Sequence, residues 1–76
     1  MTTQKEVYEV LKKYCKDEWY TTEQIKRILT NLGKSTFKIG AKLSKLSRFF
    51  RQIKVRWKNH AETGQVIREY KYVEVN

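Results

Sequence analysis

Small and basic side chains recur among apolar ones along residues 35–48, which read STFKIGAKLSKLSR. At about 100° per residue, a helix here places Ile39, Leu43, Leu46 and Phe50 on one stripe, which predicts a core-facing side. The opposite side and its flank carry small, basic or aromatic residues: Phe37, Lys38, Gly40, Ala41, Lys42, Ser44, Lys45 and Arg48. Reading base edges requires close approach, and phosphates attract cations, so this side predicts a helix that enters a DNA groove. An amphipathic helix with a solvated lysine face is the alternative.

The large side chains of this stretch differ in the contacts they can make. Lys38, Lys42 and Lys45 are expected to contact phosphates, with an affinity that falls steeply as salt rises. Arg48 presents a planar fork of donors, so we predict that it reads a guanine or clamps a phosphate with two hydrogen bonds. Phe37 either touches a thymine methyl group or packs on the preceding helix. Packing is the favoured interpretation, because an exposed phenylalanine lowers solubility.

Positive charge is concentrated in the middle of the chain. The 76 residues include 17 Lys and Arg against 8 Asp and Glu, for a net charge of +9. Between Glu23 and Glu62 there are eleven cations and no acidic residue, whereas the rest of the chain holds six cations and all eight acids. A basic surface confined to half of a small domain predicts a polyanionic partner. Anionic membranes and acidic proteins are alternative partners for such a surface, but neither explains the small residues on the helix face.

The composition bounds the other functional classes. A chain of 76 residues predicts one domain, residues 1–76, and it contains no apolar run long enough for a membrane span or signal peptide. Cys15 and His60 are the only cysteine and histidine, so we expect no disulfide, metal site or Cys/His catalytic pair. Cys15 is expected in the core of a protein kept in a reducing cytoplasm. Without a Gly-rich phosphate loop or paired carboxylates on a basic face, we expect no enzyme, no cofactor and no small-molecule substrate.

A first helix is predicted over about residues 3–16. Thr3 and Glu6 form a capping-box pattern at its start. Apolar residues at helical spacing are expected to face inward: Val7, Val10, Leu11 and Tyr14. Trp19 and Tyr20 then predict a strand of one or two residues.

A second helix is predicted over about residues 22–32, opened by the capping box of Thr21 with Gln24. Its inward residues are expected to be Ile25, Ile28, Leu29 and Leu32. Gly33 occupies the position of a C-terminal cap, and Ser35 or Thr36 is expected to cap the third helix. Two short helices joined by a glycine-containing turn are typical of a helix-turn-helix arrangement.

A β-hairpin is predicted over about residues 52–75. Residues 53–58 alternate strictly between apolar and basic, which predicts a strand with Ile53, Val55 and Trp57 in the core and a cationic outer face. A turn at 60–64 leads to a second strand rich in valine, isoleucine and tyrosine. Because its apolar residues do not all share one face, a bulge or a strand end covered on both sides is expected.

The order helix, short strand, helix, turn, helix and hairpin resembles the winged helix-turn-helix DNA-binding proteins over about residues 3–75. The resemblance rests on this order and on the run Thr-Thr-Glu-Gln-Ile…Leu-Gly…Ser-Thr, which looks like the same region of small bacterial and archaeal regulators. It implies an α+β fold, with the third helix in the major groove and the hairpin as a wing on the backbone or minor groove. The implied DNA contacts are Ser35, Thr36, Phe37, Lys38, Ala41, Lys42, Ser44, Lys45, Arg48, Arg56, Lys58, Asn59 and His60. The groove face is rich in lysine, not in arginine, asparagine or glutamine, which predicts weak sequence specificity.

The expected function is double-stranded DNA binding by a small transcriptional regulator or DNA-organising protein, cytoplasmic and nucleoid-associated, as a monomer or homodimer. One alternative is a docking module of a replication or transcription complex, whose binding would survive high salt. The other is an RNA or single-strand binder that stacks bases on Tyr70, Tyr72 and Trp57. No membrane partner is expected.

Overall fold

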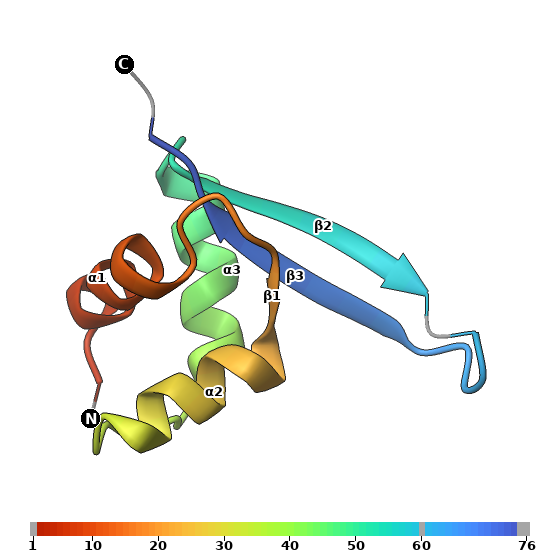
Figure 1. Ribbon diagram of the computed structural model, residues 1–76, viewed down its shortest axis with the longest axis horizontal. Helices are drawn as coiled ribbons and strands as arrows, with labels where there is room; N and C mark the ends of the chain where they lie inside the picture. The colour runs from red at the N-terminus through yellow and green to blue at the C-terminus, as the bar shows by residue number, and fades with distance from the viewer. Residues whose placement is uncertain (1, 60, 75–76) are drawn as a thin grey trace.

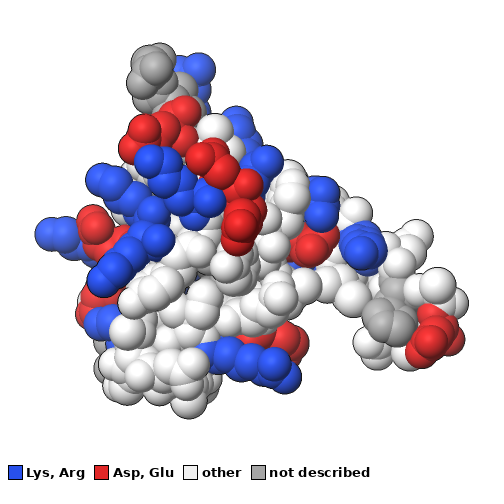
Figure 2. Space-filling view, in the orientation of Figure 1, with Lys and Arg blue, Asp and Glu red and all other residues white. Residues whose placement is uncertain are grey.

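The computed structural model describes residues 2–59 and 61–74, which form a small α+β fold. In chain order the elements are α1 (Gln4–Tyr14), β1 (Tyr20–Thr21), α2 (Thr22–Asn31), α3 (Ile39–Phe49), β2 (Ile53–Asn59) and β3 (Val66–Tyr72). The predicted order of elements is thus confirmed. The helices lie together at one side, and the β2–β3 hairpin extends away from them (Figure 1). In the space-filling view the hairpin is a projecting arm (Figure 2). Among the described residues, no helix has the length and apolarity that crossing a bilayer requires.

Local hydrogen bonds start the first two helices where the sequence predicts. The Thr3 hydroxyl accepts from the Glu6 amide at 3.2 Å. The Thr21 hydroxyl accepts from the Gln24 amide at 3.1 Å, while the Gln24 side chain accepts from the Thr21 amide at 2.8 Å. Each bond satisfies an amide that has no partner within its helix. Gly33 follows α2 with φ +73°, a conformation that glycine adopts without strain.

The third helix begins later than predicted. α3 starts at Ile39, and its N-cap, Lys38, has a left-handed backbone (φ 56°) and makes no side-chain capping bond. The expected cap, Ser35, uses its hydroxyl to accept from the Phe37 amide at 3.2 Å. Such a short-range bond competes with helix formation, so Ser35 and Thr36 stay in the connection.

The predicted inward stripes were wrong at one end of each helix. Tyr14, Leu32 and Phe50 are exposed, although each has the spacing of a core residue. Tyr14 is the last residue of α1, and the other two are the C-caps of α2 and α3. At these ends the neighbouring elements no longer cover the stripe, so periodicity alone overestimates burial.

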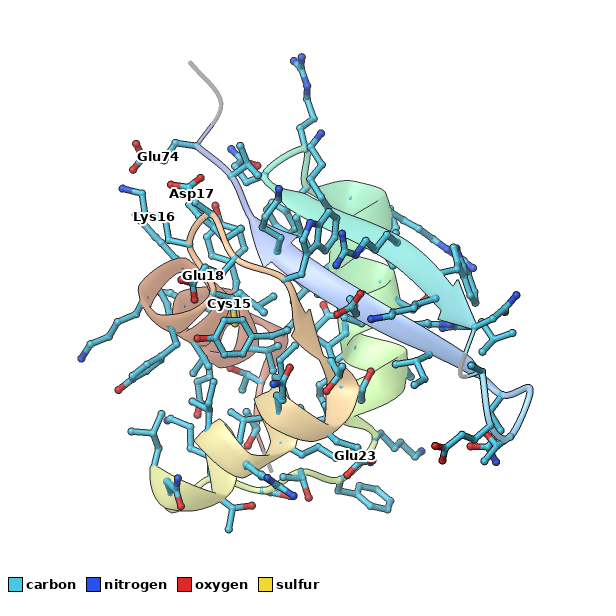
Figure 3. All side chains as sticks on the ribbon, turned by 45° about the vertical axis from the view of Figure 1, so that its right-hand side comes forward. Cys15, Lys16, Asp17, Glu18, Glu23 and Glu74 are labelled. Atoms are coloured by element: carbon cyan, nitrogen blue, oxygen red, sulfur yellow. The ribbon has the colours of Figure 1, made fainter. Side chains whose placement is uncertain are left out.

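The connection from α1 to β1 is tied to the end of β3. The Asp17 amide donates to the Tyr72 carbonyl at 2.8 Å, and the Tyr72 amide donates to the Cys15 carbonyl at 3.0 Å. Asp17 turns the chain with φ 60°. Asp17, Glu18 and Glu74 consequently lie at one end of the molecule, where Lys16 pairs with Glu74 at 3.4 Å (Figure 3).

The three strands form one antiparallel sheet in the order β1-β3-β2. Pairing between β2 and β3 is continuous from Ile53 opposite Tyr72 to Asn59 opposite Val66, so the bulge, one of the two expected explanations for the irregular pattern, is absent from these strands. Paired residues point to the same side of a sheet. The inner face of the hairpin, turned toward α3, therefore carries Ile53, Val55, Trp57, Asn59, Val66, Arg68, Tyr70 and Tyr72. The outer face carries Lys54, Arg56, Lys58, Ile67, Glu69 and Lys71.

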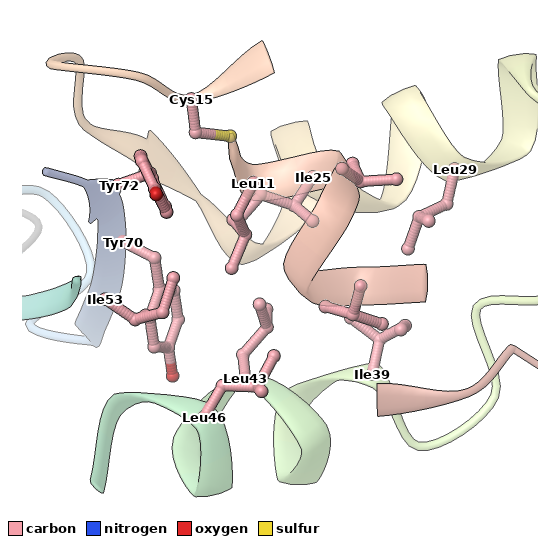
Figure 4. Packing of buried hydrophobic residues seen from close by; sticks show 12 residues of the cluster. Leu11, Cys15, Ile25, Leu29, Ile39, Leu43, Leu46, Ile53, Tyr70 and Tyr72 are labelled. Carbon is pink, nitrogen blue, oxygen red and sulfur yellow. The ribbon is translucent and has the colours of Figure 1, made fainter. Parts of the chain in front are cut away.

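The core joins all three helices to the base of the hairpin (Figure 4). Its members are Val7, Val10, Leu11, Cys15, Ile25, Leu29, Ile39, Leu43, Leu46, Ile53, Tyr70 and Tyr72. Ile53 is buried as predicted, whereas Val55 and Trp57 were wrongly assigned to the core. They point to the predicted side of the strand, but the helices cover only the first part of the hairpin.

Cys15 gives a test of this packing. The thiol is fully buried, and burial, with a smaller effect of the Glu18 charge, raises its pKa to about 12. Since the thiolate is the reactive form, we expect iodoacetamide at about pH 8 to alkylate the native protein far more slowly than the urea-unfolded protein. Mass spectrometry over time measures both rates. Equal rates under the two conditions would contradict the buried position.

Candidate nucleic-acid interface

The side of α3 that faces away from the core presents small residues and cations. Ala41, Lys45 and Arg48 are exposed, and Lys42 and Ser44 are half-buried. The half-buried Gly40 has open space around it, since an added Cβ would meet no heavy atom within 4 Å. A partner can therefore approach the α3 backbone closely at this point.

The residues expected at the start of the recognition helix lie in the connection before α3. The Ser35 carbonyl accepts from the Thr2 hydroxyl at 2.6 Å, which fixes this connection to the start of the chain. The half-buried Thr36 accepts from the Ile39 amide through its carbonyl at 3.2 Å. Ser35 is exposed in the loop just before α3, so a ligand bound to the cations of α3 could also contact it.

Phe37 lies mostly in solvent, which contradicts the favoured packing interpretation. Its side chain is 61% exposed, and the Lys38 ammonium lies 5.4 Å from the ring centroid. The Lys42 ammonium donates to the Phe37 carbonyl at 3.4 Å. The ring therefore lies beside the Lys38 ammonium just before α3, and it is available for an apolar contact such as a thymine methyl.

Replacing Phe37 with alanine is expected to change stability little. With most of the ring already in water, we expect a loss within about 1 kcal/mol in the free energy of unfolding. If the ring contacts a base, its removal is expected to lower the duplex affinity about tenfold, since such a contact contributes roughly 1–3 kcal/mol. Thermal unfolding and fluorescence anisotropy on the same protein measure the two effects. A large fall in Tm with unchanged affinity would exclude a contact role.

Ion pairs neutralise part of the positive charge that lies between Glu23 and Glu62 in the sequence. Three of the eleven central cations lie against acids from elsewhere, in the pairs Lys26–Glu23 (3.6 Å), Lys34–Glu6 (2.9 Å) and Arg56–Glu69 (2.8 Å). The hydrogen bond from Lys34 holds the pKa of Glu6 below its usual value. The other eight have no carboxylate within 4.0 Å in the part of the chain that is described: Arg27, Lys38, Lys42, Lys45, Arg48, Arg51, Lys54 and Lys58. All four cations assigned to α3 and its N-cap belong to this group.

The expected wing contacts are divided between the two faces of the hairpin. Arg56 and Lys58 lie on the outer face, and Asn59 lies on the inner face near the exposed end of β2. The Arg56 guanidinium is bound to Glu69 and lies 4.4 Å from the centroid of the Trp19 ring. Arg56 is thus engaged within the protein, whereas Lys58 is exposed and without an ion pair among the described residues. His60 lies outside the described residues.

A groove between α3 and the inner face contains residues that the sequence reasoning missed. Its volume is about 290 Å³, and its lining is Ser44, Ser47, Arg48, Val55, Trp57, Arg68 and Tyr70. The Arg68 guanidinium stacks over the Trp57 ring, with its central carbon 4.5 Å from the ring centroid. The sequence held a signal for this contact, because Trp57 and Arg68 are directly opposite each other in the register of the β2–β3 pair. The error was to assign Trp57 to the core.

Of the three aromatic rings expected to stack on bases in the single-strand binding alternative, one is exposed and two are buried. Trp57 is 61% exposed, but Tyr70 and Tyr72 belong to the core at 0% and 5%. A base cannot stack on a ring whose faces are already packed against protein. Stacking on these two tyrosines would require the hairpin to separate from the helices.

Comparisons of this chain with protein-family models, with curated proteins and with solved structures find no match. In residues 2–59 and 61–74 there is also no group of three or more His, Cys, Asp or Glu placed to hold a metal ion. The site is therefore characterised by its own geometry: a helix with open small positions, whose cations have no carboxylate partner in the described part of the chain, beside a groove that the hairpin completes.

Proposed function

We propose that this chain is a winged helix-turn-helix domain that binds double-stranded DNA. In this proposal α3 enters the major groove and the β2–β3 hairpin lies against the adjacent backbone or minor groove. The domain would serve as a small transcriptional regulator or DNA-organising protein. The observation that carries the proposal is the outward side of α3, where four cations without carboxylate partners among the described residues surround open positions at Gly40 and Ala41.

The arrangement of the elements supports this function. The core stripe of α3 packs Ile39, Leu43 and Leu46 inward, so the small and basic side must face solvent. The hairpin projects from the end of α3 instead of covering it (Figure 1). A helix flanked by a projecting arm can place one element in a groove while the other follows the phosphate backbone.

An amide NMR titration tests the proposal. The ligand is a random-sequence duplex of about 15 base pairs, which is roughly one and a half helical turns, at two salt concentrations. We expect shifts concentrated in residues 35–48 and in the hairpin, weaker at the higher salt because counterion release drives the binding. Shifts that are absent, or confined to α1, would overturn the proposal. An equal titration with single-stranded oligonucleotide distinguishes the duplex binder from the single-strand binder.

A docking module is the second candidate, and a specific surface favours it. A shallow groove between α1 and the end of α2 is lined by apolar Val10, Tyr14 and Leu32 with charged residues at its rim. Leu32 is 42% exposed there. Shifts at this groove on adding a protein partner, undiminished by salt, would favour docking over DNA binding.

A further inference from the structure

The groove between α3 and the inner face of the hairpin has the chemistry of an anion site. Arg48 reaches it from the last turn of α3, and Arg68 reaches it from β3. Both are exposed, and within the described ranges neither has a carboxylate within 4.0 Å. Two arginines that line one groove bring like charges to the same place, and an anion bound there would be attracted by both.

Trp57 restricts where the Arg68 guanidinium can be. The ring and the guanidinium stack at 4.5 Å, a cation–π contact that occupies one flat side of the arginine. The N–H donors at the edge of the guanidinium are left for a ligand, and stacking reduces the entropy lost when they bind. Arg56, on the outer face, differs because Glu69 already accepts its Nε donor at 2.8 Å.

One residue of the groove wall, Tyr70, has a buried hydroxyl without a hydrogen-bond partner among the described residues. Tyr70 is 0% exposed, and its hydroxyl is the one buried side-chain polar atom in residues 2–59 and 61–74 that lacks a hydrogen-bond partner. The nearby Ser47 hydroxyl donates to the Ser44 carbonyl at 2.7 Å. Buried hydroxyl groups are nearly always hydrogen-bonded, so an internal water is the expected partner of this one, behind the wall of the groove.

We propose that this groove seats one backbone phosphate of duplex DNA, held between Arg48 and Arg68. The inference rests on the proposed function and adds one specific contact, a phosphate that α3 and the hairpin bind together. The hairpin then binds DNA through its inner face, by Arg68 supported on Trp57, and not through Arg56. The ligand is a phosphodiester because two planar donor forks match its pair of free oxygens.

The experiment compares charge-matched variants over a series of salt concentrations. Arg68→Gln and Arg48→Gln are each expected to weaken duplex binding about eightfold at 0.1 M salt and to lower the slope of log affinity against log salt by about 0.9, the values for one phosphate contact. The control is Lys71→Gln, which removes the same charge from the outer face of the same strand. It is expected to change affinity by less than about twofold.

The double variant tests whether the two arginines share a single phosphate. If they do, Arg48→Gln with Arg68→Gln loses clearly less than the product of the two single effects, because the second substitution removes a contact already broken. A loss of affinity in the double variant equal to the product of the two single losses would show that the arginines do not share one phosphate. So would an Arg68→Gln protein that binds duplex as the Lys71→Gln control does.

A spectroscopic arm separates failure of this site from failure of DNA binding. The Trp19→Phe variant leaves Trp57 as the single tryptophan, and its emission is expected to change when duplex is added. The change should be lost in Trp19→Phe with Arg68→Gln and should not be reproduced by equimolar inorganic phosphate. If duplex binds, with unchanged Trp57 emission and unaltered affinity of Arg68→Gln, the groove assignment is wrong while DNA binding stands. If no duplex binds to the unsubstituted protein at low salt, the proposed function itself fails.

Discussion

Replacing Lys38, Lys42 and Lys45 together with glutamine is expected to lower duplex affinity roughly 500-fold at 0.1 M salt. Each lysine that neutralises a phosphate contributes about 0.9 to the salt slope, so three lost contacts lower the slope by about 2.7. The three side chains surround the open side of α3, and no described carboxylate pairs with them. Fluorescence anisotropy with a labelled duplex at four or more salt concentrations gives both the affinity and the slope.

A second triple variant controls for net charge. Lys5, Lys12 and Lys13 are exposed on α1, and changing them to glutamine removes the same three charges from a different surface. We expect this variant to retain the slope and most of the affinity, because charges beyond a Debye length of about 10 Å are largely screened at 0.1 M salt. Equal losses in the two triple variants would show that only total charge matters, and the assignment of α3 would then be withdrawn.

The Leu43→Ala substitution is expected to cost about 2–5 kcal/mol in the free energy of unfolding. Leu43 is fully buried at the centre of α3 and packs into the core that joins the helices to the hairpin. Removing it leaves a cavity in addition to the lost transfer free energy. Since small domains are stable by only about 5–15 kcal/mol, the midpoint of thermal unfolding should fall by at least about 10 °C. Urea unfolding followed by circular dichroism measures the change.

Leu32→Ala is the matched control for this substitution. It removes the same atoms at the C-cap of α2, where the side chain is 42% exposed and little cavity can form. We expect a loss of about 1 kcal/mol or less. A Leu43→Ala protein as stable as the Leu32→Ala protein would mean that α3 is not held by the core as the structure has it.

The core and the proposed interface are coupled through α3. Ile39, Leu43 and Leu46 are all buried, so they fix the rotation of the helix about its axis and thereby the side that faces solvent. A rotated helix would turn its lysines away from solvent and move Arg48 away from the groove beside the hairpin. For this reason DNA affinity of core variants is informative only where circular dichroism shows that they are folded.

The sequence by itself determined the elements and their order. The capping boxes of Thr3 and Thr21 and the glycine after α2 act over three or four residues, so the bonds they make are already implied by their spacing. The 3.6-residue period likewise placed Leu43 and Leu46 in the core. The alternation in β2 correctly assigned which side chains share a face. Each of these features depends on neighbours in the chain.

Only the tertiary structure decided which faces are covered and which charges are free. Trp57 has the alternation of a core residue, yet it is 61% exposed, because an open groove and not the core lies between it and α3. Arg56 belongs to a stretch without acids, but the sheet brings Glu69 to within 2.8 Å. The register of the hairpin sets Arg68 over Trp57 and opens the groove beside α3. Burial and ion pairing depend on residues far apart in sequence, and local pattern carries no information on where distant elements begin to cover one another.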